Sequence, residues 1–174
     1  MGKFIEQQRN LTTVKKFGII ADTHGTVPAA VFDIFFEVDQ IWHAGDIGDL
    51  SVIAELETIA PVTGVHGNVD DFPIIHRFPE SKLLRLNQSA IFIIHQYWEQ
   101  RRQKYQSSIN DSSLKIDVII FGHTHTPYLH KRKSLTLFNP GSASFPRQGY
   151  QPSVGILTVD EDYRLNFDIR FWDQ

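Results

Sequence analysis

The stretch Phe17-Gly-Ile-Ile-Ala-Asp22-Thr-His24-Gly25 decides the fold. Its first five residues form a short apolar run, which is typical of a parallel strand buried on both faces. Asp22 and His24 follow at once, and Gly25 lets the backbone turn without a side-chain clash. The same pattern recurs along the chain, where apolar runs end in tight clusters of Asp, His and Asn. The sequence therefore predicts buried strands whose carboxyl ends carry the chemistry.

The first half of the chain alternates strands with helices. Residues 28–36 begin with a proline, which suits the first turn of a helix, and residues 50–59 have apolar side chains at helical spacing. Residues 40–43 and 61–65 are short apolar runs that we interpret as the second and third strands. This β-α-β-α-β order predicts parallel strands with helices packed on them.

The second half is dominated by strands. We expect a polar surface helix at residues 98–109 and strands at 82–86, 90–94, 118–121, 128–130, 135–138, 154–159 and 165–171. The expected fold is an α/β sandwich of two packed sheets with helices outside. Because no repeat, low-complexity tract or linker interrupts the chain, we expect residues 1–174 to form a single domain.

Composition excludes several classes of protein. The 174 residues contain no cysteine, so neither a disulfide framework nor a thiolate metal site can form. Net charge is −3, and the short basic clusters at 101–104 and 131–133 do not make the broad basic face of a nucleic-acid-binding protein, so no stable nucleic-acid partner is expected. Residues 1–16 lack the apolar run of a secretory signal, and no stretch reaches the roughly 20 apolar residues of a membrane helix. We expect a cytoplasmic protein without a membrane partner.

Five polar clusters follow predicted strands: Asp22-x-His24, Gly45-Asp46-x-x-Asp49, Gly67-Asn68-x-Asp70, His95 and Gly122-His123-x-His125. In open α/β folds, ligands bind beyond the carboxyl ends of the strands, so these side chains should meet in one crevice. Carboxylates, an amide and imidazoles suit Mn²⁺, iron or Zn²⁺, and are too rich in nitrogen for Ca²⁺. Seven such side chains exceed the capacity of one ion, but two ions can share them if a carboxylate bridges. A single Asp-x-His is more often a surface or core pair, and Gly-Asn-x-Asp is usually a turn; the combination carries the argument.

In this order, and with Asn139-Pro-Gly-Ser142 after the last cluster, the motifs resemble the calcineurin-like metallophosphoesterase superfamily and its small bacterial and archaeal phosphodiesterases. The resemblance implies a four-layer α/β/β/α sandwich of two mixed sheets flanked by helices. It implies one metal ion held by Asp22, His24, Asp46 and His125, and a second held by Asp46, Asn68, His95 and His123. Asp46 would bridge the ions, and Asp46, Asn68 and His123 would be the catalytic residues.

The implied activity is a dinuclear phosphodiesterase in which a hydroxide between the ions attacks phosphorus in line with the leaving group. Mn²⁺ is the first expectation, with Fe²⁺, Ni²⁺ and Zn²⁺ as alternatives. The substrate would be a small phosphoester, and since small relatives often dimerise, a homodimer is kept open. Two further functions also stay open: a phosphomonoesterase or nucleotide pyrophosphatase on the same site, and a non-catalytic interaction scaffold of the same fold. A scaffold should have lost ligands, whereas this sequence keeps all seven.

Two departures from the family pattern bear on chemistry. Efficient protein phosphatases of the family carry a histidine after the asparagine, where this chain has Val69, which cannot donate a proton. A general acid contributes about 10²–10⁴-fold, so we expect a preference for activated esters or diesters over alkyl monoesters. The second departure is Gln96 after His95, where relatives commonly have glycine, and it should change the loop shape and pocket access.

The remaining polar and aromatic residues have less specific interpretations. We expect His43 to be buried and to brace the Asp46 loop, and His66 to be structural, with a pocket role as the alternative. Surface positions are expected for His76 and His130, loop-holding roles for Asp49 and Asp70, and packing roles for Trp42, Trp98 and Trp172. Arg147 follows the Asn139–Ser142 turn and could reach a phosphate, but contact with a phosphate is not the first expectation for it.

Overall fold

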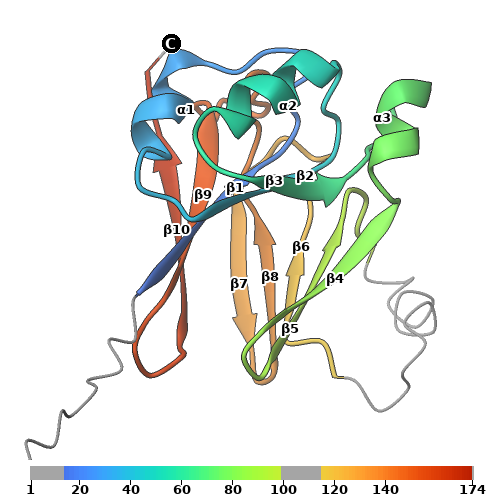
Figure 1. The fold of residues 1–174 in the computed structure, drawn as a ribbon. Coiled ribbons are helices and arrows are strands. Elements are labelled where there is room, and N and C mark those ends of the chain that lie inside the picture. Colours follow the sequence, from blue (N-terminus) through green and yellow to red (C-terminus); the bar gives the residue numbers. More distant parts are fainter. Residues whose placement is uncertain (1–13, 99–114, 174) are drawn as a thin grey trace, which may run out of the picture.

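The computed structural model of the protein describes residues 14–98 and 115–173. Two five-stranded sheets pack against each other (Figure 1). The first sheet has the order β10-β9-β1-β2-β3, and the second has the order β4-β5-β6-β8-β7. The strand bounds in the first sheet are β1 Lys15–Ile20, β2 Gln40–Ala44, β3 Val62–Val65, β9 Ser153–Val159 and β10 Leu165–Phe171. Those in the second sheet are β4 Ser81–Leu86, β5 Ser89–Ile94, β6 Val118–Ile120, β7 Tyr128–Arg132 and β8 Leu135–Asn139.

Both sheets are mixed, with a parallel part that carries the polar loops. In the first sheet β1, β2 and β3 are parallel neighbours, while the β9–β10 hairpin adds on antiparallel beside β1. In the second sheet β5, β6 and β8 are parallel, and the edge strands β4 and β7 are antiparallel to their neighbours. The carboxyl ends of the parallel strands are therefore free to present loops at one edge of each sheet.

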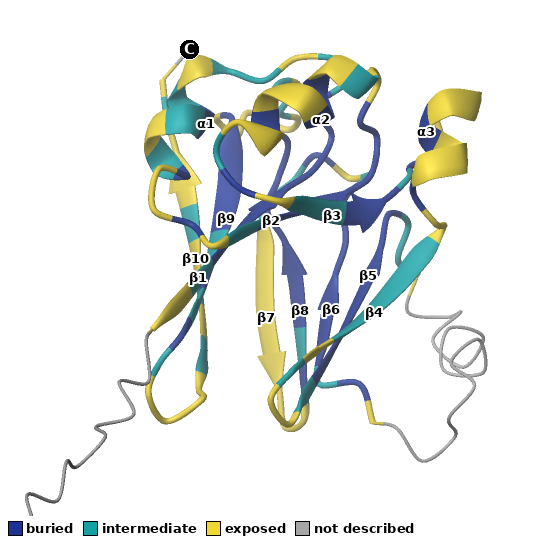
Figure 2. Ribbon diagram, viewed as in Figure 1, coloured by how far each residue is buried: buried dark blue, intermediate teal, exposed yellow. Residues whose placement is uncertain are grey.

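Apolar side chains fill the space between the sheets and the space under the helices. Between the sheets, Ile19, Trp42 and Leu157 of the first pack with Ile93, Ile120 and Phe138 of the second. Helices α1 (Ala29–Ile34) and α2 (Leu50–Glu57) cover the outer face of the first sheet, with Val31, Ile53 and Leu56 buried beneath them (Figure 2). The α/β sandwich of two mixed sheets with flanking helices is confirmed.

The local predictions mostly hold to within one or two residues, with two exceptions. Helix α3 (Phe72–Arg77) was not predicted, because its six residues are too few for a helical period and Pro73 reads equally well as a turn. All but the first residue of the helix expected at 98–109 lie outside the described part of the chain. Within the described residues, the longest helices are too short to cross a membrane.

Candidate metal centre

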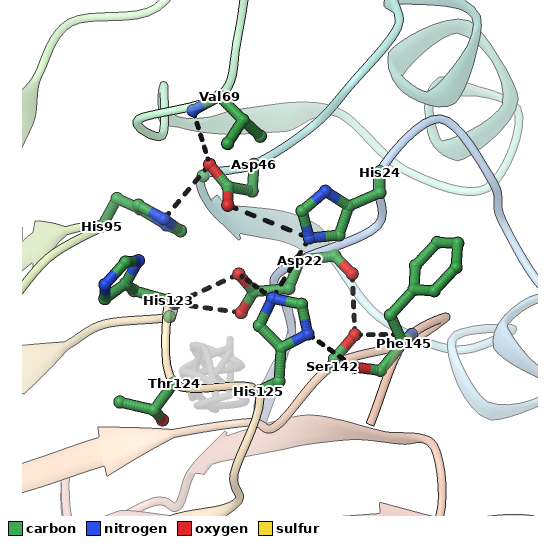
Figure 3. A network of polar contacts seen from close by, with 12 residues as sticks. Asp22, His24, Asp46, Val69, His95, His123, Thr124, His125, Ser142 and Phe145 are labelled. Carbon is green, nitrogen blue, oxygen red and sulfur yellow. Dashed lines mark hydrogen bonds and ion pairs between the residues drawn. The ribbon is translucent and has the colours of Figure 1, made fainter. Parts of the chain in front are cut away.

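The polar loops from both sheets meet at one place. Beyond β1 and β2, backbone hydrogen bonds continue from strand to loop: the amides of Asp22, His24 and Gly25 donate to the carbonyls of Gly45, Asp46 and Ile47 at 3.0, 3.0 and 2.8 Å. From the second sheet, the amide of Gly122 donates to the carbonyl of His95 at 3.1 Å, which joins the loops after β5 and β6. Figure 3 shows Asp22, His24, Asp46, His95 and His125 directed toward one centre.

Glycines allow these loops to touch. A Cβ atom at Gly67 would lie 1.9 Å from Oδ1 of Asp46 and 2.2 Å from its amide nitrogen. At Gly48 it would lie 2.4 Å from the amide nitrogen of Gly25. Real Cβ atoms do not come so close to other heavy atoms, so the sequence needs glycine at both positions to pack the loops around Asp46.

Most of the candidate ligands have left-handed backbone conformations. The φ angles of Asp22, His24, Asp46, His123 and His125 are 53°, 45°, 53°, 68° and 56°. Such values are uncommon for residues other than glycine, and they cluster where the surrounding structure holds the strain for function.

The described residues contain two donor groups, and both include Asp46. Asp22, His24, Asp46 and His125 form one group, and Asp46, His95 and His123 form the other, with the ligand atoms of each within 4.8 Å of one another. Oδ1 of Asp46 lies 3.2 Å from Nε2 of His95, whereas Oδ2 lies 3.8 Å from Nε2 of His24. The two oxygens of one carboxylate thus face different groups.

Backbone carbonyls orient two of the imidazoles. Nδ1 of His95 donates to the carbonyl of Ala44 at 2.8 Å, and Nδ1 of His125 donates to the carbonyl of Phe145 at 2.5 Å. A neutral ring that donates from Nδ1 has its lone pair on Nε2, and in both residues Nε2 faces the donor groups. This is the usual way in which a protein fixes a ligating histidine.

The electrostatics show how strongly these groups interact. Burial raises the pKa of Asp22 to about 7, and the nearby Asp46 carboxylate adds to the rise while His95 opposes it. Burial also acts on the Asp46–His95 pair, but their mutual attraction outweighs it, so the pKa of Asp46 is lowered and that of His95 is raised. Burial lowers the pKa of His123 and of His125. These shifts in opposite directions follow from burying carboxylates and imidazoles together at one centre.

Nε2 of His95 tests whether a cation fits this space. The atom is buried and makes no hydrogen bond with the described residues, although Oδ1 of Asp46 is 3.2 Å away. A buried polar nitrogen without a hydrogen bond is costly unless another partner takes its lone pair. Imidazole nitrogens and carboxylate oxygens are together the donor set of Mn²⁺, Fe²⁺, Ni²⁺ or Zn²⁺. The residues fit divalent transition-metal ions.

Asn68 and Gln96 complete the rim. Oδ1 of the exposed Asn68 accepts a hydrogen bond from Nε2 of Gln96 at 2.8 Å, and the same nitrogen lies 3.5 Å from Nδ1 of His123. Gln96 therefore lies across the side of the centre formed by His123 and Asn68. From this position we still expect Gln96 to alter access to the pocket.

Several residues behind the ligands stabilise them, and sequence reasoning found only some of them. His43 is fully buried, as expected: its Nδ1 accepts from the amide of Gly45 at 3.1 Å, and its Nε2 donates to Oγ1 of Thr23 at 2.9 Å. The carboxylate of Asp70 accepts from the amides of Gly48 and Gly67 at 2.8 and 2.7 Å, which ties two loops together. Asp49 caps helix α2 through the amide of Ser51.

The Asn139–Ser142 turn holds ligand loops in place by hydrogen bonds. In the sequence, this segment was noted only because it resembles a family motif. Nδ2 of Asn139 donates to the carbonyl of Gly122 at 2.8 Å, and Oγ of Ser142 donates to the carbonyl of Asp22 at 2.8 Å. The same Oγ accepts from the amide of Phe145 at 2.8 Å. The turn thus fixes ligand loops of both sheets, a role visible only once the strands are paired.

The remaining candidates take various positions. Nδ1 of His66 lies 3.0 Å from the carbonyl of Gly67, so its ring is held by its own loop. His76 and His130 are exposed, and Trp42 is buried, as predicted. Trp98 differs from the expectation: 46% of it is exposed, and its ring lies 6.1 Å from that of His123.

The fold and this donor set define a metal-dependent phosphoesterase, and comparison with known proteins agrees. The profile of the calcineurin-like phosphoesterase superfamily domain matches residues 16–162, so the chain belongs to that superfamily.

Individual relatives match most of the chain. A probable metallophosphoesterase of Methanothermobacter thermautotrophicus is 38% identical over 82% of this chain and 85% of its own length. The phosphodiesterase YfcE of Escherichia coli is 28% identical over 83% of this chain and 88% of its own. Among solved structures, a Thermotoga maritima protein superimposes with a TM-score of 0.71 at 27% identity, covering 91% of this chain and 99% of that one.

Proposed function

We propose that this protein is a dinuclear phosphodiesterase that acts on small phosphoester substrates. The observation that carries the proposal is the position of Asp46, which turns one carboxylate oxygen toward His24 and the other toward His95. A carboxylate in this position is suited to join two cations, and the two donor groups that share it supply the other ligands.

The proposed ligand sets follow the two groups. Asp22, His24, Asp46 and His125 would hold one ion; Asp46, Asn68, His95 and His123 would hold the other. Mn²⁺ is the first candidate, and Fe²⁺, Ni²⁺ and Zn²⁺ suit the same donors. When bound, two such ions lower the pKa of a coordinated water and neutralise the charge of the phosphoryl oxygens.

The protein's own contribution is to position the ligands in advance. Carbonyls of Ala44 and Phe145 hold two imidazoles with their lone pairs facing inward. The amide of Val69 donates to Oδ1 of Asp46 at 3.2 Å, which fixes the carboxylate from a third loop. Because these groups are already oriented, little reorganisation is needed when charge develops at phosphorus.

The leaving group receives no proton from position 69. The Val69 side chain is 55% exposed at the rim, and only its backbone amide takes part in the hydrogen bonding of the centre. An alcohol that departs without a general acid must be stable as an anion. We therefore propose activated phosphodiesters, rather than alkyl monoesters, as the better substrates, in keeping with the phosphodiesterase named among the relatives.

The first experiment compares bis(4-nitrophenyl) phosphate with 4-nitrophenyl phosphate. Chelator-stripped protein is assayed before and after Mn²⁺ is added, alongside His123→Ala and, as a matched control, His130→Ala on the exposed strand β7. We expect turnover that requires metal, favours the diester and falls at least 100-fold in His123→Ala but not in His130→Ala.

The other outcomes separate the remaining functions. Turnover of the monoester alone would replace the phosphodiesterase with a phosphomonoesterase on the same ions. If calorimetry shows that ions bind while neither ester is hydrolysed with any of the four metals, the enzyme proposal fails and the interaction scaffold replaces it.

A further inference from the structure

A cavity of about 490 Å³ opens beside the donor group that contains Asp22. It is lined by His24, His125, Phe145, Pro146 and Arg147. Two of these are proposed metal ligands, so a phosphate bound at the centre would have this cavity next to one of its ester oxygens. The volume is in the range of small-molecule sites, about 300–1,000 Å³.

Phe145 forms an aromatic wall of this cavity. The residue is 53% exposed, yet its position is fixed from behind, because its amide donates to Oγ of Ser142 and its carbonyl accepts from Nδ1 of His125. Its ring stands edge-on to that of His24, with the centroids 5.4 Å apart (Figure 3). A rigidly held, solvent-facing ring beside a polar centre offers an apolar surface on which a planar group can stack.

Arg147 supplies the cationic side of the same wall. Its amide donates to the carbonyl of His125 at 3.4 Å, so the backbone of this segment is attached to the ligand loop. Burial raises the pKa of Asp22 and lowers the pKa of His123 and of His125; the positive charge of Arg147 opposes the rise at Asp22 and adds to the fall at the two histidines. Because Arg147 lines the cavity together with His24 and His125, its guanidinium lies beside the place where a phosphate would bind, and guanidinium groups pair well with phosphate oxygens.

We propose that Phe145 and Arg147 form a nucleoside subsite, so that the preferred substrate is a phosphodiester carrying a nucleoside on one ester oxygen. Phe145 stacks on the base, and Arg147 contacts a non-bridging phosphate oxygen. This inference rests on the proposed phosphodiesterase and names its substrate class. The cavity has room for a mononucleoside group, and the net charge of −3 and the lack of a broad basic face favour a small diester over a nucleic-acid chain.

The kinetic test uses two diesters with the same leaving group: thymidine 5′-(4-nitrophenyl) phosphate and ethyl 4-nitrophenyl phosphate. Because the chemistry at phosphorus is matched, the ratio of their kcat/KM values isolates recognition of the retained group. Stacking of a base on an aromatic side chain contributes about 1–3 kcal/mol, so we expect a ratio above about 10 in the natural protein. Phe145→Leu should reduce the ratio about tenfold, and Phe145→Trp should retain it. Phe36→Leu is the matched control, since Phe36 is 81% exposed and lies outside this cavity.

The second readout is calorimetric binding of thymidine 5′-phosphate and ethyl phosphate, with and without Mn²⁺. Phe145→Leu should weaken thymidine 5′-phosphate about tenfold and leave ethyl phosphate unchanged. Arg147→Gln should weaken both ligands, while Arg164→Gln at an exposed ion pair with Asp162 should weaken neither.

These results distinguish failure of the subsite from failure of the enzyme. A ratio near 1 in the natural protein, or a ratio that survives Phe145→Leu, overturns the subsite while the metal-dependent turnover of the ethyl ester still supports the phosphodiesterase. If neither ester is turned over but thymidine 5′-phosphate binds in a Phe145-dependent way, the phosphodiesterase fails and the subsite stands. Absence of both turnover and binding overturns both.

Discussion

Nε2 of His24 lies within hydrogen-bonding distance of Nε2 of His125, at 3.1 Å. The ring of His125 already donates from Nδ1 to the carbonyl of Phe145, so its Nε2 has a lone pair to offer. Oδ1 of Asp22 is a further acceptor 3.4 Å from that nitrogen. In the tautomer that carries its proton on Nε2, His24 donates to that lone pair. A cation bound among these acceptors would take the place of the shared proton.

Metal removal should therefore cost stability as well as activity. With Mn²⁺ at 100 times its dissociation constant, binding to the folded state alone adds about 2.7 kcal/mol, which corresponds to a rise in Tm of about 5–10 °C for a chain of this size. Thermal unfolding with and without Mn²⁺ measures the shift. His125→Asn should lose most of it, whereas the exposed His130→Asn should retain it. An equal shift in both variants would show that the ion binds elsewhere.

Gly67→Ala should abolish activity through Asp46. The added Cβ would lie 1.9 Å from Oδ1 of Asp46 and 2.2 Å from its amide nitrogen, so backbone as well as side chain must move. We expect at least a 100-fold loss of kcat/KM together with weaker Mn²⁺ binding by calorimetry. The control is Gly149→Ala, where φ is +76° and no atom lies within 4 Å of the added Cβ. Gly149→Ala adds a Cβ at a left-handed position, with backbone strain of about 1 kcal/mol but no clash, so its metal affinity should be unchanged. Normal Mn²⁺ affinity in Gly67→Ala would contradict the bridging role of Asp46.

Val69→His should reduce the dependence of rate on the leaving group. The exposed side chain can change while the amide still donates to Oδ1 of Asp46. A proton donor at this rim helps poor leaving groups most, so the slope of log kcat/KM against leaving-group pKa should become shallower across aryl diesters. The rate with the poorest leaving group should rise about 10–100-fold. Val69→Leu controls for size and should retain the steep slope. A shallow slope in the natural protein would refute the view that it lacks a general acid.

Buried His43 should make the protein sensitive to acid. Burial lowers the pKa of His43 from 6.5 to about 3, since its Nδ1 faces the amide of Gly45 and has no room for a second proton. The unfolded chain binds that proton below pH 6.5, whereas the folded protein does not bind it until about pH 3. The stabilisation is complete above pH 6.5 and is lost as pH falls toward 3, at about 1.4 kcal/mol per pH unit and up to about 5 kcal/mol in total.

Urea unfolding of metal-free protein between pH 4 and 7 measures this effect. His43→Gln preserves an acceptor for Gly45 and a donor for Thr23 but does not titrate. The slope of its free energy of unfolding against pH should therefore be smaller than that of the natural protein by the contribution of about one proton. His76→Gln, at an exposed position on α3, should have the slope of the natural protein. Parallel curves for His43→Gln and the natural protein would rule out His43 as the source of the acid sensitivity.

Much of the fold was predictable because strand periodicity and motif position agree in this chain. The runs ending at Ala21, His43 and Val65 are short and largely apolar, which predicts buried parallel strands, and each is followed within three residues by a polar side chain. Convergence of the clusters then follows from parallel strand topology alone. Helix α3 was missed because six residues beginning at Phe72 contain too little pattern to distinguish a helix from a turn.

The parts of the site that sequence reasoning did not find depend on long-range pairing. Ser142 bonds to the carbonyl of Asp22, 120 residues away, and Asn139 bonds to Gly122. Neither side chain has a local pattern that distinguishes a brace from an ordinary turn. The left-handed backbone of five of the ligands, Asp22 and His24 among them, was also not predicted. Such a strained conformation is stable only when contacts among the assembled loops hold it in place. The exposed position of Trp98 near His123 was not predicted either, because it too depends on contacts between distant parts of the chain.

The donors come from both halves of the sandwich: Asp22, His24 and Asp46 extend from the first sheet, and His95, His123 and His125 from the second. Ions held there would cross-link the two sheets through the loops that meet at this edge. Sliding or hinging of one sheet against the other would then break coordination. In mechanical terms, the loaded protein should resist shear between its sheets at this edge, and the metal-free protein should yield there first.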